Sequence, residues 1–223
     1  MQLLAYLFIF PLLWIISILP FRVFYLVSDL VCFVTYNVIG YRKKVVRNNI
    51  KLALPHLSDK ERLVIEKKFY THLCDLFLEM IKTISISQKE MEKRFTFSNM
   101  EVYYELEKKN KSIAVICAHY ASYEWVVSMN YYINCKGYGI YKKLANPYFD
   151  TLVRKIRSKF KSHLIDSKET IPTMASNFRN KTFSLYGLVS DQSPKLSATH
   201  HWQKFMGIEV PVHDTIPQEV EVE

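Results

Sequence analysis

The chain has 223 residues, of which 49% are hydrophobic, so it is long enough to build a sizeable core and is not expected to be disordered. Lysine and arginine outnumber aspartate and glutamate by 30 to 21, and the formal net charge of +9 predicts an acidic partner: nucleic acid, anionic lipid or an acidic carrier protein. The four cysteines form no CxxC pair and each lies in an apolar segment, which argues against a zinc site or a disulfide framework and predicts reduced, buried thiols facing the cytoplasm.

Residues 1–40 are predicted to form a hydrophobic, membrane-associated helical segment. No charged residue occurs from Leu3 to Leu19, and a helix of that length just reaches across a hydrocarbon core of about 30 Å. Residues 21–40 are also aromatic and nearly uncharged, which predicts a second helix that skims the membrane or packs in a core. A full span and an in-plane monotopic helix both fit this pattern, and the alternative is a buried amphipathic hairpin in a soluble protein.

Residues 41–94 are predicted to form a basic helical region. Five basic residues and no acid occur from Arg42 to Lys51, which by the positive-inside rule assigns this side of the segment to the cytoplasm. Ser58 and Glu61 have the spacing of a capping box, and the helix that they open is predicted to continue to about Lys82. Apolar residues recur at helical spacing along it, so its predicted role is packing.

Residues 95–212 are predicted to form the α/β core, because strand-like and helical patterns alternate along them. The predicted strands cover 95–97, 112–118, 138–141, 163–165 and 183–189, and the predicted helices cover 100–110, 121–134, 147–160 and 169–180. Such alternation is typical of a mostly parallel sheet flanked by helices. Functional sites in these sheets collect where the strands end. Polar residues follow three of the predicted strands, and we expect them to face one crevice: His119, Lys142 with Lys143, and Asp191 with Gln192.

His119 and Glu124 are the candidate catalytic pair. An imidazole accepts a proton from a hydroxyl nucleophile, and a neighbouring carboxylate orients the ring and stabilises the imidazolium. Positions i and i+5 of a regular helix lie about 140° apart, so the two side chains meet only if the turn between them is not helical. A strand-to-helix turn gives that freedom. The alternative is a histidine satisfied at a strand end beside an exposed helical carboxylate.

The segment from Ala118 to Trp125 resembles the H-x-x-x-x-[DE] block of the glycerolipid and lipid A acyltransferases. The chain as a whole is similar to the late lipid A acyltransferase family of Gram-negative bacteria, of the lauroyl and myristoyl type, within the lysophospholipid acyltransferase-like superfamily. The resemblance spans about residues 1–212, and further blocks follow in the expected order: the apolar N-terminus, residues 45–50, residues 141–150 followed by Arg154 and Arg157, residues 188–194 and residues 202–207.

This resemblance implies transfer of a fatty acyl chain from acyl carrier protein, or a related thioester, to a hydroxyl of a lipid A precursor or related lipid. The implied location is the cytoplasmic face of the inner membrane, on an anionic surface. His119 is then the general base and Glu124 its orienting partner. The implied substrate-binding residues are Lys142, Asp191 and two arginines of the block that follows the Asn-Pro turn, Arg154 and Arg157. No metal or other cofactor is expected, because a thioester is already activated.

Other interpretations remain open at this stage. The basic residues suit lipid phosphates or a phosphopantetheine arm, and the alternative is a solvated helix face. Asp191 is either an organiser of the substrate or a loop cap. The alternative function is a noncatalytic membrane-anchored protein that binds anionic lipid or an acidic partner; nucleic acid is disfavoured, because no recognised module accompanies the charge. Residues 213–223 depart from the family pattern, which predicts a truncated chain, an incomplete core and an atypical tail.

Overall fold

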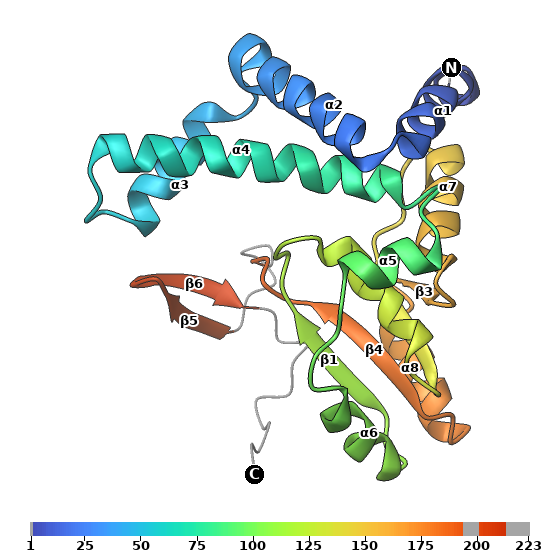
Figure 1. Cartoon of the computed structure of the whole chain (residues 1–223). Helices are drawn as coiled ribbons and strands as arrows, with labels where there is room; N and C mark the ends of the chain where they lie inside the picture. The colour runs from blue at the N-terminus through green and yellow to red at the C-terminus, as the bar shows by residue number, and fades with distance from the viewer. Residues whose placement is uncertain (1, 194–200, 213–223) are drawn as a thin grey trace.

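A long helix, α4 (Asp59–Lys82), crosses the molecule between the N-terminal helices and the sheet (Figure 1). The computed structural model describes residues 2–193 and 201–212. At the start of α4, the backbone N–H of Glu61 donates to the Ser58 hydroxyl, and the Glu61 carboxylate accepts the backbone N–H of Ser58 at 2.7 Å. The predicted capping box and the predicted helix up to residue 82 are therefore both confirmed.

The N-terminal segment consists of α1 (Gln2–Ile18), α2 (Phe21–Phe33) and a π-helical continuation, η1 (Val34–Ile39). Both α1 and α2 pack on α4 and leave most of their apolar side chains exposed. Among the described helices, Phe21–Ile39 is the one that is long and apolar enough to cross a membrane, and only 11% of it is buried. The second predicted helix is therefore the one that is long enough to span a membrane, whereas α1 is apolar but shorter than a span requires.

Lys82 joins the end of α4 to the end of α1. Its buried ammonium group donates hydrogen bonds to the backbone carbonyls of Ser17 at 2.7 Å and Leu19 at 2.5 Å. A cation at a helix C-terminus satisfies carbonyls that have no partner within the helix and complements the helix dipole. This contact fixes the angle at which the N-terminal segment leaves the rest of the protein.

Two helices flank α4 in the basic region. The amphipathic helix α3 (Lys43–Ala53) packs on α4 and buries none of its residues completely. Arg47 fastens it, because the Arg47 guanidinium lies 2.9 Å from the Glu66 carboxylate.

The short helix α5 (Gln88–Arg94) was not predicted, and it contributes Met91 to a buried cluster with Trp125 and other apolar side chains. The predicted strand at 95–97 is wrong: these residues form an irregular connection, because Phe95 packs against that cluster instead of pairing.

The central sheet contains β1 (Ile113–Cys117), β2 (Lys136–Tyr141), β3 (His163–Asp166) and β4 (Ser184–Val189). Its order is β1-β4-β2-β3 and every neighbouring pair is parallel, so all four strands end at the same edge. The predicted α/β fold class with a mostly parallel sheet is confirmed. Leu185 and Tyr186 point to opposite faces of β4 and are both buried, so helices cover both faces there.

Helices α6 (Met100–Lys108), α7 (Pro147–Ser158) and α8 (Thr170–Arg179) match predicted helices. The predicted helix at 121–134 is instead a shorter 3₁₀ helix, η2 (Tyr123–Tyr131), packed on β2. Gly137 of β2 permits this close approach, because a Cβ there would lie 1.9 Å from the Asn130 side-chain oxygen.

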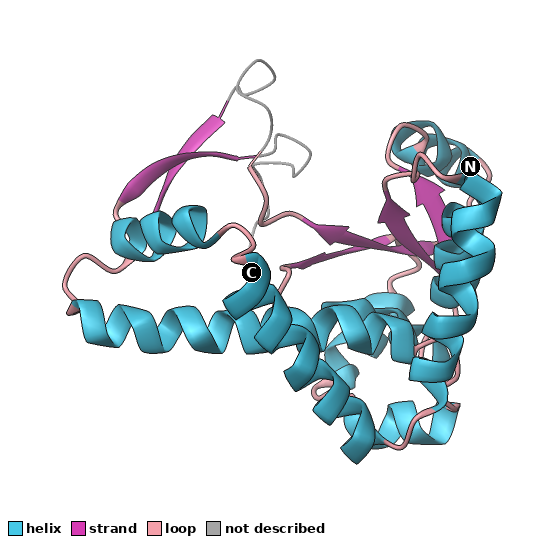
Figure 2. Ribbon diagram, turned by 90° about the horizontal axis from the view of Figure 1, so that it is seen from above, coloured by secondary structure: helices cyan, strands magenta, loops and turns pink. Residues whose placement is uncertain are grey.

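A separate antiparallel hairpin, β5 (His201–Phe205) with β6 (Ile208–Val212), was not predicted and stands apart from the central sheet (Figure 2). Its turn consists of Met206 and Gly207, which both have positive φ values, 52° and 79°, as a tight hairpin turn requires. The predicted atypical tail at residues 213–223 lies outside the described residues.

Candidate functional site

His119 and Asp191 meet at the edge where the central strands end. Because β1 and β4 are hydrogen-bonded neighbours, the residues that follow them lie side by side, and the backbone N–H of Ser190 donates to the carbonyl of Cys117 at 3.1 Å. Asp191 then holds His119 twice. Its Oδ2 accepts the His119 backbone N–H at 2.8 Å, and its Oδ1 lies 2.7 Å from the ring Nδ1.

This contact selects a tautomer of the imidazole. Desolvation raises the pKa of Asp191, but the hydrogen bonds from the His119 ring and backbone outweigh it and lower that pKa below its ordinary value. An ionised Asp191 accepts a hydrogen bond from Nδ1–H, which leaves the lone pair on Nε2. The amide nitrogen of Gln192 lies 3.4 Å from Nε2, and the His119 side chain is 31% exposed. Nε2 is therefore an accessible proton acceptor.

Tyr123 packs against the same imidazole. The two rings meet edge to face, with their centroids 4.6 Å apart. Burial raises the pKa of the Tyr123 phenol to about 12, and the negative charge of Glu124 adds to the shift. The phenol thus stays protonated at neutral pH, and the Tyr123 ring supports the imidazole by packing against it.

Glu124 lies at the start of η2 and forms a bidentate ion pair with Arg157 of α7. Arg157 donates from Nε to Oε2 at 2.9 Å and from its terminal nitrogen to Oε1 at 2.5 Å. The Glu124 side chain is 8% exposed and that of Arg157 is 23% exposed. Desolvation lowers the pKa of Arg157, but the hydrogen bonds and charge of the Glu124 carboxylate outweigh it and raise that pKa, so the guanidinium stays protonated. The pair fastens η2 to α7.

The carboxylate on the His119 ring is therefore that of Asp191, whereas the sequence pattern assigned this position to Glu124. The turn from His119 to Glu124 is not helical, as expected, but it directs the Glu124 side chain inward to Arg157. Asp191, predicted to organise a substrate, follows the strand beside β1 and so reaches the ring. Arg157, which was expected to bind substrate, points to the interior and pairs with Glu124.

The other two predicted basic residues, Lys142 and Arg154, lie apart from Arg157. Lys142 and Arg154 line a cavity of about 520 Å³ at the strand-end edge, together with Lys143 and Lys168. Asp166 and Glu169 contribute negative charge to the same wall. Arg154 reaches this cavity because Asn146 caps α7, its side-chain oxygen accepting the backbone N–H of Tyr148 at 3.0 Å, and so sets where the helix begins.

A second cavity, of about 230 Å³, lies under Arg157 and is almost entirely apolar. Side chains from α1, α4 and α7 line it, along with the residue Leu144 that follows β2: Leu13, Met80, Ile81, Ile84, Phe149, Leu152, Val153 and Ile156. Arg157 is its one charged lining residue, and its guanidinium is engaged by Glu124. The ion pair therefore joins the wall of this apolar space to the turn that runs from His119 to Glu124.

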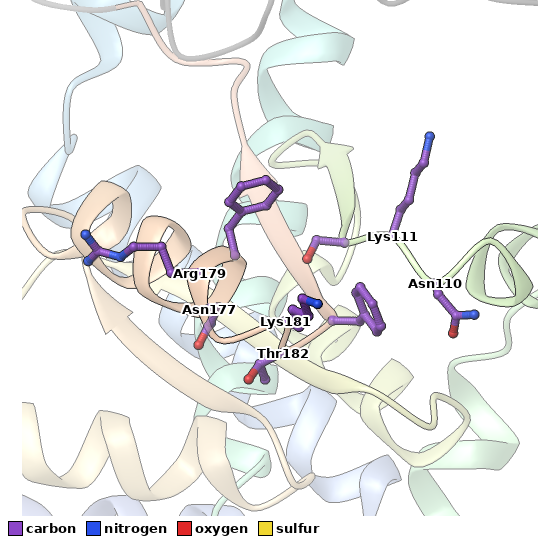
Figure 3. A pocket seen from close by; sticks show the side chains of 9 residues that line it. Asn110, Lys111, Asn177, Arg179, Lys181 and Thr182 are labelled. Atoms are coloured by element: carbon purple, nitrogen blue, oxygen red, sulfur yellow. The ribbon is translucent and has the colours of Figure 1, made fainter.

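A larger cavity, of about 700 Å³, is at the opposite edge of the sheet (Figure 3). Its labelled side chains include Lys111 before β1 and Thr182 before β4, so it opens where those strands begin. Since His119 and Asp191 follow the other ends of the same strands, this cavity is not part of the candidate site. Volume alone is a poor guide to the chemistry here.

Gln192 was expected at the strand-end crevice beside Asp191, and it lies at His119. Tyr123 is a site residue that the sequence pattern did not single out, and its position next to Glu124 is the only signal that marks it. Within residues 2–193 and 201–212, no cluster of three or more His, Cys, Asp or Glu side chains is placed to hold a metal ion.

Comparison with known proteins gives one finding. No curated protein matches the chain. Residues 2–206 match the model of a family described as bacterial lipid A biosynthesis acyltransferase. The match covers the N-terminal helices, the central sheet, the His119–Asp191 pair and β5. The chain therefore belongs to the bacterial lipid A biosynthesis acyltransferase family, a family of enzymes whose biosynthetic role suggests association with a membrane.

Proposed function

We propose that this acyltransferase moves a fatty acyl chain from an acyl carrier protein thioester to a hydroxyl of a lipid A precursor or a closely related lipid. The observation that carries the proposal is the His119–Asp191 contact, with Nδ1 and Oδ1 2.7 Å apart, which leaves Nε2 as the proton acceptor. In this scheme His119 is the general base and Asp191 orients it. Glu124 supports the arrangement through its ion pair with Arg157.

The reaction needs only a base and an acid at one position. The acceptor hydroxyl attacks the thioester carbonyl carbon while its proton moves to Nε2 of His119. The tetrahedral intermediate then collapses, the carbon–sulfur bond breaks, and the imidazolium returns the proton to the leaving thiolate. The products are an ester and a free thiol. The ionised Asp191 stabilises the imidazolium between the two transfers.

Two cavities support the proposed substrates. Lys142, Lys143, Arg154 and Lys168 line the polar one, and such a cluster suits the phosphate groups of a lipid acceptor or the phosphopantetheine arm of the donor. The apolar cavity between α1, α4 and α7 suits the hydrocarbon chain. Arg157 lines this apolar cavity and binds Glu124. It therefore connects the proposed acyl-chain cavity to the turn from His119 to Glu124, which we call the catalytic turn.

The proposed location is the cytoplasmic face of the inner membrane. The exposed apolar side chains of α1 and α2 support contact with a lipid interior, and Phe21–Ile39 has the length for a span. The amphipathic helix α3 carries Lys43, Lys44, Arg47 and Lys51, which suits anionic headgroups.

The experiment that tests the proposal compares purified wild type with His119→Ala, using acyl carrier protein thioester and a lipid A precursor in mixed vesicles. We expect kcat to fall by about 10²–10⁴-fold. His72→Ala, on the exposed surface of α4, is the matched control and should retain activity. Retained activity in His119→Ala would remove the proposed base. Binding to anionic vesicles without any His119-dependent turnover would instead favour a noncatalytic lipid-binding protein.

A further inference from the structure

The carboxylate of Glu79 lies between the candidate membrane helix and the catalytic turn. From α2, the Tyr25 hydroxyl donates to its Oε1 at 2.8 Å. From the turn between β1 and η2, the Ser122 hydroxyl donates to its Oε2. One side chain of α4 therefore binds an element of the N-terminal segment with one oxygen and the segment from His119 to Glu124 with the other.

The catalytic turn needs such an external restraint. Ala121, in its middle, has a φ of 48°, a left-handed conformation that is unfavourable for a residue with a Cβ and persists only where the surroundings hold it. Trp125, 3% exposed, fastens the far side of the turn to α4 by donating from its indole N–H to the Glu79 carbonyl at 3.3 Å and to the Thr83 hydroxyl at 3.0 Å. Glu79 thus contacts the turn through its side chain and its backbone.

Other polar contacts join the same helices without touching the turn. The Ser28 hydroxyl of α2 donates to Asp75 at 2.6 Å, one helical turn before Glu79. The Tyr36 hydroxyl of η1 donates to Glu66 at 3.0 Å, farther along α4. These two contacts are of the same kind as the Tyr25 contact, so they separate helix packing from any effect on the site.

We propose that Glu79 is a positioning residue that couples the seating of α2 on α4 to the geometry of the His119–Glu124 turn. When α2 is seated, Tyr25 orients the Glu79 carboxylate, which holds Ser122 and keeps the strained turn in the conformation that presents His119. When α2 is displaced, Glu79 loses one partner and the turn loosens. This inference rests on the proposed function and adds to it that contacts of α2 with lipid regulate turnover.

The test is a double-mutant cycle on Tyr25→Phe and Ser122→Ala, with Glu79→Gln as the third variant, in lipid vesicles. We expect each single change to lower kcat about tenfold, the effect of about one hydrogen bond, while KM and vesicle binding stay unchanged. The double variant should lose much less than the product of the two single effects, because both act through Glu79. Glu79→Gln should resemble the double variant.

The control variants are Ser28→Ala and Tyr36→Phe, which should keep kcat within about twofold, because the hydrogen bonds that they remove end at Asp75 and Glu66. A kcat loss in Ser28→Ala equal to that in Tyr25→Phe would overturn the proposal, since it would mean general loosening of the helix pair. Purely multiplicative effects of Tyr25→Phe and Ser122→Ala would also overturn it.

Amide hydrogen exchange gives a readout that does not depend on activity. Tyr25→Phe should increase exchange in residues 119–125, and Ser28→Ala should leave it unchanged there. If His119→Ala retains activity but Tyr25→Phe loosens the turn, the proposed base is wrong and the coupling stands. If His119→Ala is inactive and Tyr25→Phe changes neither exchange nor kcat, the coupling is wrong and the proposed function stands.

Discussion

Asp191 binds His119 by both the backbone N–H and the ring, through its two carboxylate oxygens at 2.8 Å and 2.7 Å. The backbone contact holds the Asp191 carboxylate at the end of β1, so that its second oxygen stays within reach of the ring. The orientation of the imidazole is therefore tied to the pairing of the two strands, and the first two predictions follow from that tie.

Replacing Asp191 by Asn should lower kcat by about 10²–10⁴-fold while the fold is retained. An amide nitrogen facing Nδ1 disfavours the tautomer in which Nε2 accepts the proton. The measurement is single-turnover acyl transfer at pH 7.5. Asp59→Asn, at a carboxylate that is 97% exposed, is the control and should match wild type. Equal rates for Asp191→Asn and wild type would mean that the ring needs no orienting carboxylate.

The same pair predicts a pH dependence of stability. Hydrogen bonds from His119 hold the pKa of Asp191 below its ordinary value in the folded protein, despite the opposing effect of desolvation. A carboxylate of this kind contributes stability that is fully present above its unfolded pKa of about 3.9 and is lost as pH falls through the lower folded value. The difference in Tm between wild type and Asp191→Asn that is measured at pH 5 should therefore shrink as the pH falls below about 4. A difference that does not change with pH would contradict this.

The Glu124–Arg157 pair predicts a large cost when one partner is removed. Arg157→Ala leaves the Glu124 carboxylate, 8% exposed, without its cation, and should lower the free energy of unfolding by roughly 3–5 kcal/mol. Arg154→Ala, at an exposed position of the same helix, should lower it by less than about 0.5 kcal/mol. Urea denaturation in detergent measures both. Similar values for the two variants would show that the ion pair adds nothing to stability.

The polar cavity predicts a charge effect on the acceptor. The double variant Lys142→Glu with Arg154→Glu should raise KM for a phosphorylated acceptor at least tenfold and leave kcat nearly unchanged, because the two side chains line the cavity and do not touch His119. Raising the salt concentration should raise the wild-type KM and have little effect on the variant. Lys181→Glu, at the large cavity of the opposite edge, is the control. An equal KM shift in the control would assign the effect to net charge.

The apolar cavity predicts the acyl-chain preference. Val153→Trp adds a large side chain to the lining between α1 and α7, and should shift the preferred donor to a shorter chain. The measurement is competition between acyl carrier protein thioesters of two lengths, with the products resolved by mass spectrometry. Val102→Trp, at a site on α6 that is 59% exposed, should leave the preference unchanged. An unaltered preference in Val153→Trp would place the hydrocarbon chain elsewhere.

The elements with a clear local sequence signal were predictable, and those without one were not. The capping box at Ser58 and the alternation after residue 112 are local signals, so α4 and the parallel sheet follow from them. Helix α5 is seven residues long and mostly polar, so no apolar period marks it. The β5–β6 hairpin turns at Met206 and Gly207, which lack the Asn-Gly signature of a tight turn.

The site was predictable as a set of residues but not as a set of contacts. His119 stands out because a polar residue follows an apolar strand and because its hexapeptide fits a known block. Its pairing with Asp191, 72 positions later, depends on β4 lying beside β1. The order of strands in a sheet cannot be inferred from the spacing of residues within one segment. The direction of Arg157 depends in the same way on how α7 faces η2.

The central position of β4 also constrains how the chain is made. β1 and β2 emerge from the ribosome first, and β4 must later insert between them and pair with both. A lasting early pairing of β1 with β2 would occupy the edges to which β4 must bind. The two strands therefore have to stay unpaired with each other until β4, which ends at residue 189, has been synthesised. Sheet closure and assembly of the His119–Asp191 pair are then one late event, and a chain stalled before it carries the histidine without the group that orients it.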